Sequence, residues 1–308
     1  MPGDQGAPPP SETLPRRCGH VAVVGRPNVG KSTLVNRLVG QKVSITSTKP
    51  QTTRHRILGV RTAGVAQTLY VDTPGLHRAA GRAMNRMMNR VAGAALEDVD
   101  LVVFVVEALR WTTDDDLVLG TLQGLRAPVI VAINQVDRVR EKEALLPFMA
   151  ELATRLDFAE IVPVSARRGT GLPSLAREVE RRLPPAPWLF PEDQVTDRSV
   201  RFLAAEIVRE KLTRRMGDEV PYRLSVETEE FVEEGALTRI RMVVWVEKAG
   251  QKAIVIGQGG RALKAVATQA RRDLERMLER PVYLSVWVKV REGWSDDKQA
   301  LRRMGYEG

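Results

Sequence analysis

The sequence predicts two domains: an α/β domain with a mostly parallel sheet covered by helices on both faces, followed by a smaller α+β domain. A length of 308 residues fits two domains of ordinary size. Up to about residue 183, apolar runs of strand length alternate with amphipathic stretches of helix length, which is typical of a buried parallel sheet. A proline-rich stretch then follows, and beyond it the order of helices and strands changes.

The first domain is expected to contain six strands, each a short run rich in Val, Ile and Leu. Amphipathic patterns with the 3.6-residue period of a helix lie between most of these runs. The second and third runs look like an antiparallel hairpin with Gly64 near its turn. The expected strands are residues 20–24, 57–60, 67–71, 101–106, 129–133 and 161–164, and the clearest helices are residues 33–38, 114–125 and 144–156.

These patterns divide the chain into four parts. We expect an N-terminal tail (residues 1–17), the α/β domain (18–184), a linker (185–197) and the α+β domain (198–308). The tail is rich in proline and lacks an apolar segment, so we expect disorder and no signal peptide. The second domain should contain, in order, a helix at 198–216, strands at 222–229 and 238–247, a helix–turn–helix around Gly257 and a strand at 282–290.

The composition excludes several classes of protein. With 43% hydrophobic and 28% charged residues, the chain is neither disordered throughout nor a fibre. Its one cysteine, Cys18, excludes an internal disulfide, and its apolar runs are too short for a membrane span. The formal net charge of +9 suggests a polyanionic partner. We therefore expect a cytoplasmic protein.

The first expected strand leads into a phosphate-binding loop that fits the pattern G-x-x-x-x-G-K-[ST]. The glycines let backbone N–H groups turn toward a phosphate, the lysine places a positive charge beside the β- and γ-phosphates, and the serine hydroxyl can bind Mg²⁺. The following helix N-terminus also favours an anion. The candidate phosphate-binding residues are Gly25, Arg26, Pro27, Asn28, Val29, Gly30, Lys31, Ser32 and Thr33.

Three further motifs follow expected strands, at the sheet edge where open α/β sheets bind ligands. Asp72-Thr73-Pro74-Gly75 places a carboxylate beside Mg²⁺ and the Gly75 amide near the γ-phosphate. In Asn134-Gln135-Val136-Asp137, the Asp137 carboxylate can accept two hydrogen bonds from guanine, which adenine cannot supply, and Asn134 can brace a neighbouring loop. In Ser165-Ala166-Arg167, a backbone amide can meet guanine O6. Together these motifs predict a site for GTP and GDP.

The order of these motifs resembles that of translation-factor-class GTPases. Residues 49–56, Lys-Pro-Gln-Thr-Thr-Arg-His-Arg, resemble the first switch of the Era family in particular. The resemblance covers residues 19–306 and implies that Thr53, or alternatively Thr52, binds Mg²⁺ together with Ser32 and Asp72. The family usually has Lys where this chain has Gln135, so we expect a weaker contact with the purine but unchanged guanine selectivity.

The hydrolytic step must work without the water-orienting Gln of Ras-type enzymes, because Leu76 stands at that position. The neighbouring His77 is expected to be solvated. Catalysis is then expected to come from phosphate positioning by Lys31, Thr53 and the Gly75 amide, with Mg²⁺. The resemblance implies that Asn28 also ligates K⁺; the alternative, that Asn28 only stabilises the loop turn, stays open.

The second domain contains a G-x-x-G loop between two helical segments. In this order of helices and strands it resembles a type II KH domain, whose loop clamps the backbone of single-stranded RNA. The family often has Lys where this chain has Gly259, which predicts modestly weaker RNA binding. The aromatic residues Trp245, Tyr283, Trp287 and Trp294 are expected to be core anchors. The candidate RNA-binding residues are Ile256, Gly257, Gln258, Gly259, Gly260, Arg261 and Lys264.

The Era resemblance implies a function in assembly of the 30S ribosomal subunit. The implied partner is 16S rRNA near its 3′ end, bound by a monomer that also associates peripherally with the inner membrane. A second interpretation is a membrane-associated signalling switch that couples growth or the cell cycle, in which the KH-like domain only docks proteins. The sequence shows no lipidation motif and no clear amphipathic membrane helix, which favours the first interpretation.

Overall fold

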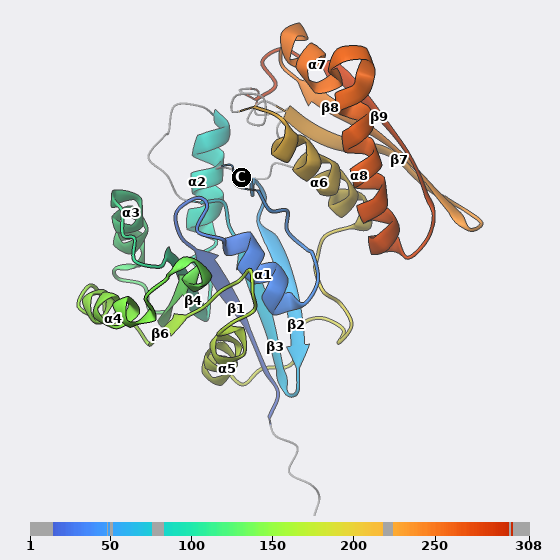
Figure 1. Ribbon diagram of the computed structural model, residues 1–308. Helices are drawn as coiled ribbons and strands as arrows, with labels where there is room; N and C mark the ends of the chain where they lie inside the picture. The colour runs from blue at the N-terminus through green and yellow to red at the C-terminus, as the bar shows by residue number, and fades with distance from the viewer. Residues whose placement is uncertain are drawn as a thin grey trace, which may run out of the picture.

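The computed structural model describes residues 15–47, 49, 52–75, 83–217, 224–295 and 297. The chain folds into two sheets, each with its own helices (Figure 1). The described strands are β1 (Arg17–Val24), β2 (Ile57–Ala63), β3 (Ala66–Asp72), β4 (Leu101–Glu107), β5 (Val129–Asn134), β6 (Glu160–Pro163), β7 (Leu224–Glu234), β8 (Leu237–Val246) and β9 (Val282–Val290). The described helices are α1 (Lys31–Val39), α2 (Ala83–Ala94), α3 (Thr113–Leu122), α4 (Leu145–Ala153), α5 (Leu172–Arg182), α6 (Val200–Arg215), α7 (Ala249–Ile256) and α8 (Arg261–Leu278).

The first sheet has six strands in the order β2-β3-β1-β4-β5-β6. All neighbouring pairs are parallel except β2 and β3, which form the expected hairpin with Gly64 in its turn at φ 56°. One face packs on α1 and α5, and the other packs on α3 and α4. The expected fold class of the first domain is confirmed. The sequence patterns did not single out α2 or α5.

The strand order places the loops that carry chemistry at one edge. After β1 the chain builds β3 on one side and then β4 on the other, so the order reverses beside β1. In open α/β sheets, ligands bind at such a reversal, outside the carboxyl ends of the strands. The loops that follow β1, β3, β5 and β6 therefore meet at this edge.

The proline-rich stretch between the two domains lies against the first sheet. Ala186, Trp188 and Phe190 pack on the apolar face of β2 and β3. The side-chain oxygen of Gln67 accepts the amides of Leu189 and Phe190 at 2.9 and 3.0 Å. These contacts hold the stretch that leads to the second domain against β2 and β3.

The second domain follows the order α6-β7-β8-α7-α8-β9, as the sequence predicts. β7 and β8 are antiparallel, β8 and β9 are parallel, and the helices pack on one face of the sheet over a core that includes Val208, Met242 and Leu274. β7 continues to Glu234, beyond its expected end at residue 229.

The aromatic side chains of this domain divide between its core and its surface. Trp294 is fully buried, as expected, and Trp245 is partly buried. Tyr283 and Trp287, however, are 56% and 60% exposed, so the expectation that they anchor the core is wrong. Side chains alternate between the two faces of a strand, and both lie on the face of β9 opposite the buried Val282 and Val288.

Candidate nucleotide site and KH loop

The phosphate loop begins and ends at glycines that no other residue could replace without strain. Gly25 has φ 149°, and a Cβ there would lie 2.4 Å from the carbonyl oxygen of Val105. Gly30 caps α1 with φ 99°, and a Cβ there would lie 2.4 Å from Nδ2 of Asn134. The loop can therefore approach both β4 and the loop after β5 only because these positions lack a side chain.

Lys31 lies inside the loop with its charge directed at backbone oxygens. Its Nζ donates to the carbonyls of Gly25 and Arg26 at 2.8 and 2.9 Å. The side chain is 6% exposed, and burial lowers the pKa of Lys31 to about 8. A phosphate in this loop would supply the negative charge that the buried ammonium lacks.

Arg26 anchors the loop from behind, a role that the sequence analysis did not identify. Its guanidinium forms ion pairs with Glu107 at the end of β4 and with Asp115 in α3, the latter at 3.1 Å. Arg26 is 9% exposed and Asp115 is fully buried. The Arg26 side chain therefore points into the protein, and only its backbone faces the loop interior.

Three oxygen-bearing side chains, those of Ser32, Thr53 and Asp72, gather beside the start of α1. The hydroxyls of Ser32 and Thr53 lie 2.8 Å apart, whereas Thr52 Oγ1 donates to the carbonyl of Lys49 at 2.6 Å. Of the two threonines considered as Mg²⁺ ligands from the sequence, Thr53 is the one whose hydroxyl lies beside that of Ser32.

Asp72 completes this group with a fully buried carboxylate. Ser44 Oγ donates to its Oδ2 at 2.6 Å, while the buried Oδ1 has no hydrogen-bond partner within the part of the chain that the structure describes. Burial raises the pKa of Asp72, although the hydroxyls of Ser44 and Ser32 oppose this. A buried carboxylate oxygen without a partner, next to two hydroxyls, is a donor set that fits Mg²⁺.

The rest of the Asp72 motif supports the loop. Thr73 Oγ1 donates to the carbonyl of Val23 at 3.1 Å, so this side chain braces β1, and Pro74 is buried. Gly75 lies against the phosphate loop: a Cβ there would be 2.9 Å from the nitrogen of Pro27. Leu76 and His77, on which the expectation about hydrolysis partly depends, lie outside the described residues.

The base-recognition motifs are held together by Asn134, as predicted. Its Nδ2 donates to the carbonyl of Val29 at 2.8 Å, and its Oδ1 accepts the amide of Ala166 at 3.0 Å. One buried side chain therefore ties the phosphate loop to the loops after β5 and β6. Of the backbone amides in Ser165-Ala166-Arg167, one of which is expected to meet guanine O6, that of Ala166 donates to Asn134.

Asp137 lies at the open side of this arrangement. Its Oδ1 accepts the Ser165 hydroxyl at 2.7 Å, and this hydrogen bond lowers the pKa of Asp137, so the group stays ionised as an acceptor. Gln135 has a left-handed backbone with φ 69°, and its Nε2 donates to the carbonyl of Asn28 at 3.3 Å. The Gln135 side chain thus bridges the loop after β5 and the phosphate loop.

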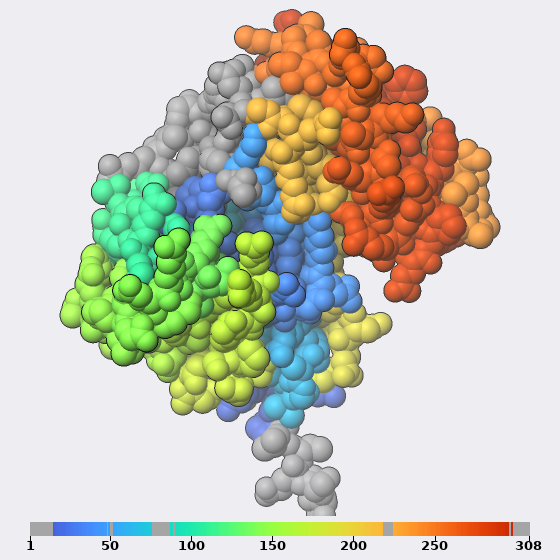
Figure 2. Space-filling view, in the orientation of Figure 1, coloured from blue at the N-terminus to red at the C-terminus, as the bar shows by residue number. Residues whose placement is uncertain are grey.

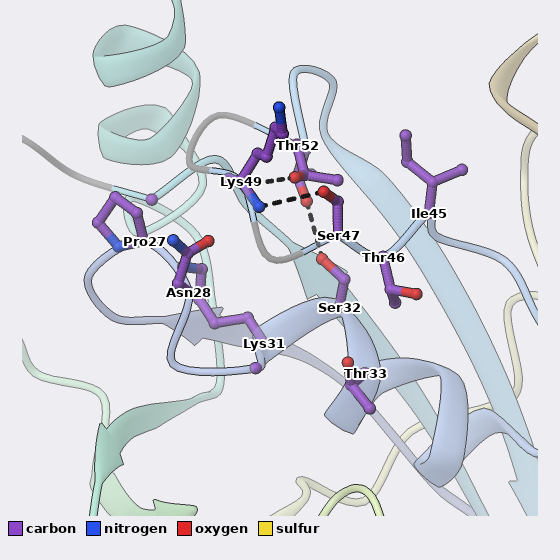
Figure 3. A pocket seen from close by; sticks show the side chains of 13 residues that line it. Pro27, Asn28, Lys31, Ser32, Thr33, Ile45, Thr46, Ser47, Lys49 and Thr52 are labelled. Carbon is purple, nitrogen blue, oxygen red and sulfur yellow. Dashed lines mark hydrogen bonds between the residues drawn. The ribbon is translucent and has the colours of Figure 1, made fainter. Parts of the chain in front are cut away.

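Two adjoining hollows run along this edge. The phosphate side is lined by the loop, by Gly75 and by residues that precede β2, several of which Figure 3 shows around the hollow. The base side has a volume of about 410 Å³, a size typical of small-molecule sites. Its lining includes the predicted Asn134, Asp137, Ala166 and Arg167, and also Arg214 of α6, which nothing in the sequence pattern indicated.

The G-x-x-G loop joins α7 to α8 at the far end of the second domain (Figure 1). Gly257, Gly259 and Gly260 have φ values of 71°, 58° and 76°. A Cβ at Gly257 would lie 2.5 Å from that of Ala262, whereas Gly259 and Gly260 face open space. The loop therefore presents backbone without side chains, at the beginning of a helix.

The residues around this loop are placed for contact with solvent or a ligand. Gln258, Arg261 and Lys264 are exposed, and Arg261 folds back on Gln258. Val255 is fully buried and Ile256 is partly buried, so the apolar run before the loop serves partly as core. Farther along α8, the arginines pair with neighbouring acids, as Arg271 does with Glu275 and Arg276 with Asp273.

Comparisons with known proteins agree with this arrangement. The family of 50S ribosome-binding GTPases matches residues 20–135, and the KH domain family matches residues 219–295. The GTPase Era of Pseudomonas aeruginosa is 54% identical over 290 residues, which are 94% of this chain and 95% of that protein. The GTPase Era of Stenotrophomonas maltophilia is 54% identical over 297 residues, 96% of this chain and 100% of that protein.

Solved structures agree as well. Era in complex with MgGDPNP and nucleotides 1506–1542 of 16S ribosomal RNA superposes with a TM-score of 0.92 at 38% identity, covering 95% of this chain and 100% of that chain. An Aquifex aeolicus Era variant bound to GDP and AlF4⁻ superposes with a TM-score of 0.91 at 39% identity, and it also covers 95% of this chain and 100% of that chain. The fold and site define a P-loop GTPase that carries a type II KH domain. Within that class, the chain belongs to the Era family of GTPases.

Proposed function

We propose that this GTPase binds 16S rRNA near its 3′ end and acts in the assembly of the 30S ribosomal subunit in the cytoplasm. The observation that carries the proposal is the G-x-x-G loop, whose Gly259 and Gly260 face open space at the start of α8. Such a loop lets phosphates approach the backbone closely. The related Era whose structure contains a 16S rRNA segment shares the fold over 95% of this chain.

For the nucleotide site, we propose that Ser32, Asp72 and Thr53 hold Mg²⁺. Among the described residues, no group of three or more His, Cys, Asp and Glu could hold a metal, so the ion would depend on this mixed set and on the phosphates. Bound Mg²⁺ would neutralise charge on the β- and γ-phosphates. The chain's own part is to hold these oxygens close together, and the hydroxyls of Ser32 and Thr53 lie 2.8 Å apart.

For the hydrolytic step, we propose that the loop works by positioning and charge. Lys31 leaves the carbonyls of Gly25 and Arg26 to contact the β- and γ-phosphates, and the Gly75 amide contacts the γ-phosphate. Asn28 lines both hollows with a left-handed backbone at φ 65°, and we assign it as the ligand of a K⁺ ion beside the phosphates. Asp137 accepts guanine N1–H and N2–H₂, which sets the preference for guanine.

The test compares RNA with membranes as the partner of the full chain. The chain should be retained by an immobilised 3′ fragment of 16S rRNA, and an unrelated RNA of equal length should compete poorly. Vesicles containing anionic lipid are the second arm. Among the described residues, no helix is long and apolar enough to span a bilayer. Binding to vesicles but not to the rRNA fragment would overturn the proposal and favour a membrane-associated switch.

A further inference from the structure

The helix α6 of the KH domain lies against the segment that joins α1 to β2 in the GTPase domain. This α1–β2 segment (residues 40–56) supplies Thr46, Ser47, Lys49, Thr52 and Thr53 to the phosphate-side hollow. Figure 2 shows the atoms of α6, in gold, packed on the blue atoms of the first domain. One wall of the nucleotide site therefore touches the second domain directly.

At one end of the α1–β2 segment, Glu210 of α6 holds Thr46. The side chain of Glu210 is fully buried, and its Oε1 accepts the Thr46 amide at 3.0 Å and the Thr46 hydroxyl at 3.3 Å. Its Oε2 accepts Nζ of Lys42 at 2.5 Å. Arg214, one turn further along α6, donates to the Thr46 carbonyl at 2.9 Å. Both the N–H and the C=O of Thr46 are thus bound by the second domain.

Near the other end, Arg209 of α6 holds Thr52. Its guanidinium donates to the Thr52 carbonyl at 2.6 Å and is held by two hydrogen bonds of 2.6 Å to the Glu206 carboxylate. Arg209 is 2% exposed. Because Thr53 follows Thr52 directly, this hydrogen bond fixes the peptide that leads to Thr53, whose hydroxyl lies 2.8 Å from that of Ser32.

The side chains that make these contacts between the two domains are buried and charged, and they bind the main chain of the nucleotide-site wall. Buried charged side chains are costly unless they are paired and hydrogen-bonded. Here Glu210 and Arg209 are buried where they bind main-chain groups of Thr46 and Thr52, two residues that line the nucleotide site. These hydrogen bonds therefore determine where the main chain of the α1–β2 segment lies at Thr46 and at Thr52.

We propose that α6 is a component of the GTPase site supplied by the KH domain. Glu210 and Arg209 are positioning residues, which hold Thr46 and Thr52 so that Thr53 stands beside Ser32 ready for Mg²⁺. The inference rests on the role proposed above for Thr53 in holding Mg²⁺. It also has a reciprocal consequence: whatever moves α6 alters the nucleotide site, and the bound nucleotide biases α6 to the same extent.

The experiment uses the full chain with Glu210→Gln, which keeps the size of the side chain and removes its charge, and with Arg209→Gln, which removes the charge and shortens the side chain. The matched control is Arg201→Gln, because Arg201 lies on the same helix but hydrogen-bonds only within the KH domain, to the carbonyls of Thr228 and Glu229 at 2.9 and 3.2 Å. Four quantities are measured: kcat for GTP, the Mg²⁺ concentration that gives half-maximal turnover, the Kd for GDP, and Tm.

Both variants should lower kcat by about tenfold and raise the required Mg²⁺ concentration, because Thr53 is no longer held beside Ser32. The Kd for GDP should stay within about twofold, since the phosphate loop and the base contacts are untouched. The Arg201→Gln control should match the wild type. A residue that only supported the fold would not raise the Mg²⁺ requirement while leaving GDP binding intact.

Unchanged kcat in both variants would overturn the inference. A fall in GDP affinity and in Tm that accompanies the fall in kcat would also overturn it, because it would indicate general damage to the fold. If Arg209→Gln does not fold, the double change Glu206→Leu with Arg209→Leu replaces the buried ion pair by apolar side chains that can pack. It should show the same fall in kcat. A failure of the role proposed for Thr53 is recognised separately, because Thr53→Ala would then leave both wild-type turnover and its Mg²⁺ dependence unaltered.

Discussion

Ser32 and Thr53 bring their hydroxyl oxygens within 2.8 Å of each other, although one begins α1 and the other lies in the α1–β2 segment near β2. Asp72, at the end of β3, is buried beside them with one carboxylate oxygen unpartnered within the described residues. Three segments that are distant in sequence thus bring side-chain oxygens to one point. This is the group of side chains that we propose as the Mg²⁺ site.

The first prediction concerns the choice of base. Asp137→Asn should move the nucleotide preference from GTP toward XTP, because xanthine bears an oxygen where guanine bears N2–H₂, and an amide can donate to it. The remaining amide oxygen can still accept the Ser165 hydroxyl, which now lies 2.7 Å from the carboxylate. The measurement is the Kd for GTP, XTP and ATP in both proteins. Equal wild-type affinity for ATP and GTP would contradict the guanine assignment.

The second prediction concerns the cation at Asn28. Wild-type turnover should be faster in K⁺ than in Na⁺ at equal ionic strength, and Asn28→Gly should remove the difference. Glycine accepts the left-handed backbone of this position, at φ 65°, so the variant loses the amide without strain in the loop. Identical wild-type rates in the two salts would exclude the K⁺ role and leave the other catalytic assignments standing.

The third prediction concerns the G-x-x-G loop. Gly260→Asp should lower affinity for the 16S rRNA fragment by tenfold or more, roughly, because it puts a carboxylate where phosphates must approach. Gly260→Asn is the matched control, since Asn has the same shape, tolerates a positive φ and carries no charge. A Cβ at Gly260 meets nothing within 4 Å, and both variants carry the same strain of a side chain at φ 76°, so the difference between them isolates the charge.

GTP affinity and turnover without RNA should be the same in both Gly260 variants. Equal RNA binding by Gly260→Asp and the wild type would refute the assignment of this loop to RNA. Gly257 is a poorer test position, because a Cβ there would collide with Ala262 at 2.5 Å and confuse lost binding with a distorted loop.

The fourth prediction concerns pH and the interface between the domains. His55 packs edge-on against Phe202 of α6 with ring centroids 5.2 Å apart, and burial lowers the pKa of His55 from 6.5 to about 4. Between these values the unfolded chain binds a proton that the folded chain does not. This group therefore contributes stability that is complete above pH 6.5 and is lost as pH falls toward 4, by about 1.4 kcal/mol per pH unit.

Urea unfolding of the wild type and of His55→Gln at several pH values tests this. Carboxylates other than Glu206, whose charge interacts with His55, affect both proteins alike, so the difference in their free energies of unfolding reports on His55 and this neighbour. The wild type should lose stability faster than the variant below pH 6.5. Parallel curves would show that His55 is not buried in its neutral form.

The residues that the sequence grouped into one candidate nucleotide site do meet in the structure, because the grouping relied on short, contiguous motifs. Lys31, Asn134 and Asp137 each lie at or beyond the carboxyl end of a strand, and parallel strands bring these ends to one edge. The brace formed by Asn134 follows from the same logic. The choice of Thr53 over Thr52 came from the family resemblance alone, since two adjacent polar residues of one loop have the same local pattern.

The contacts between domains could not be predicted in this way. Arg209, Glu210 and Arg214 are ordinary members of a charged helix in sequence, and their partners lie 157 to 168 residues away. Their burial depends on how the two domains dock. Tyr283 and Trp287 were instead expected to be buried, because large aromatic side chains are often found in cores. The alternation of side chains along β9 places both on the exposed face of the sheet.

In our proposal, the state of the bound nucleotide and the RNA affinity of the second domain are coupled through α6. The most direct test is the affinity of the full chain for the 3′ fragment of 16S rRNA, measured with a non-hydrolysable GTP analogue and with GDP at the same salt concentration. The account predicts tighter binding with the GTP analogue, and a smaller difference in Arg209→Gln than in the Arg201→Gln control. Equal wild-type affinities in the two nucleotide states would contradict it and leave two independent domains on one chain.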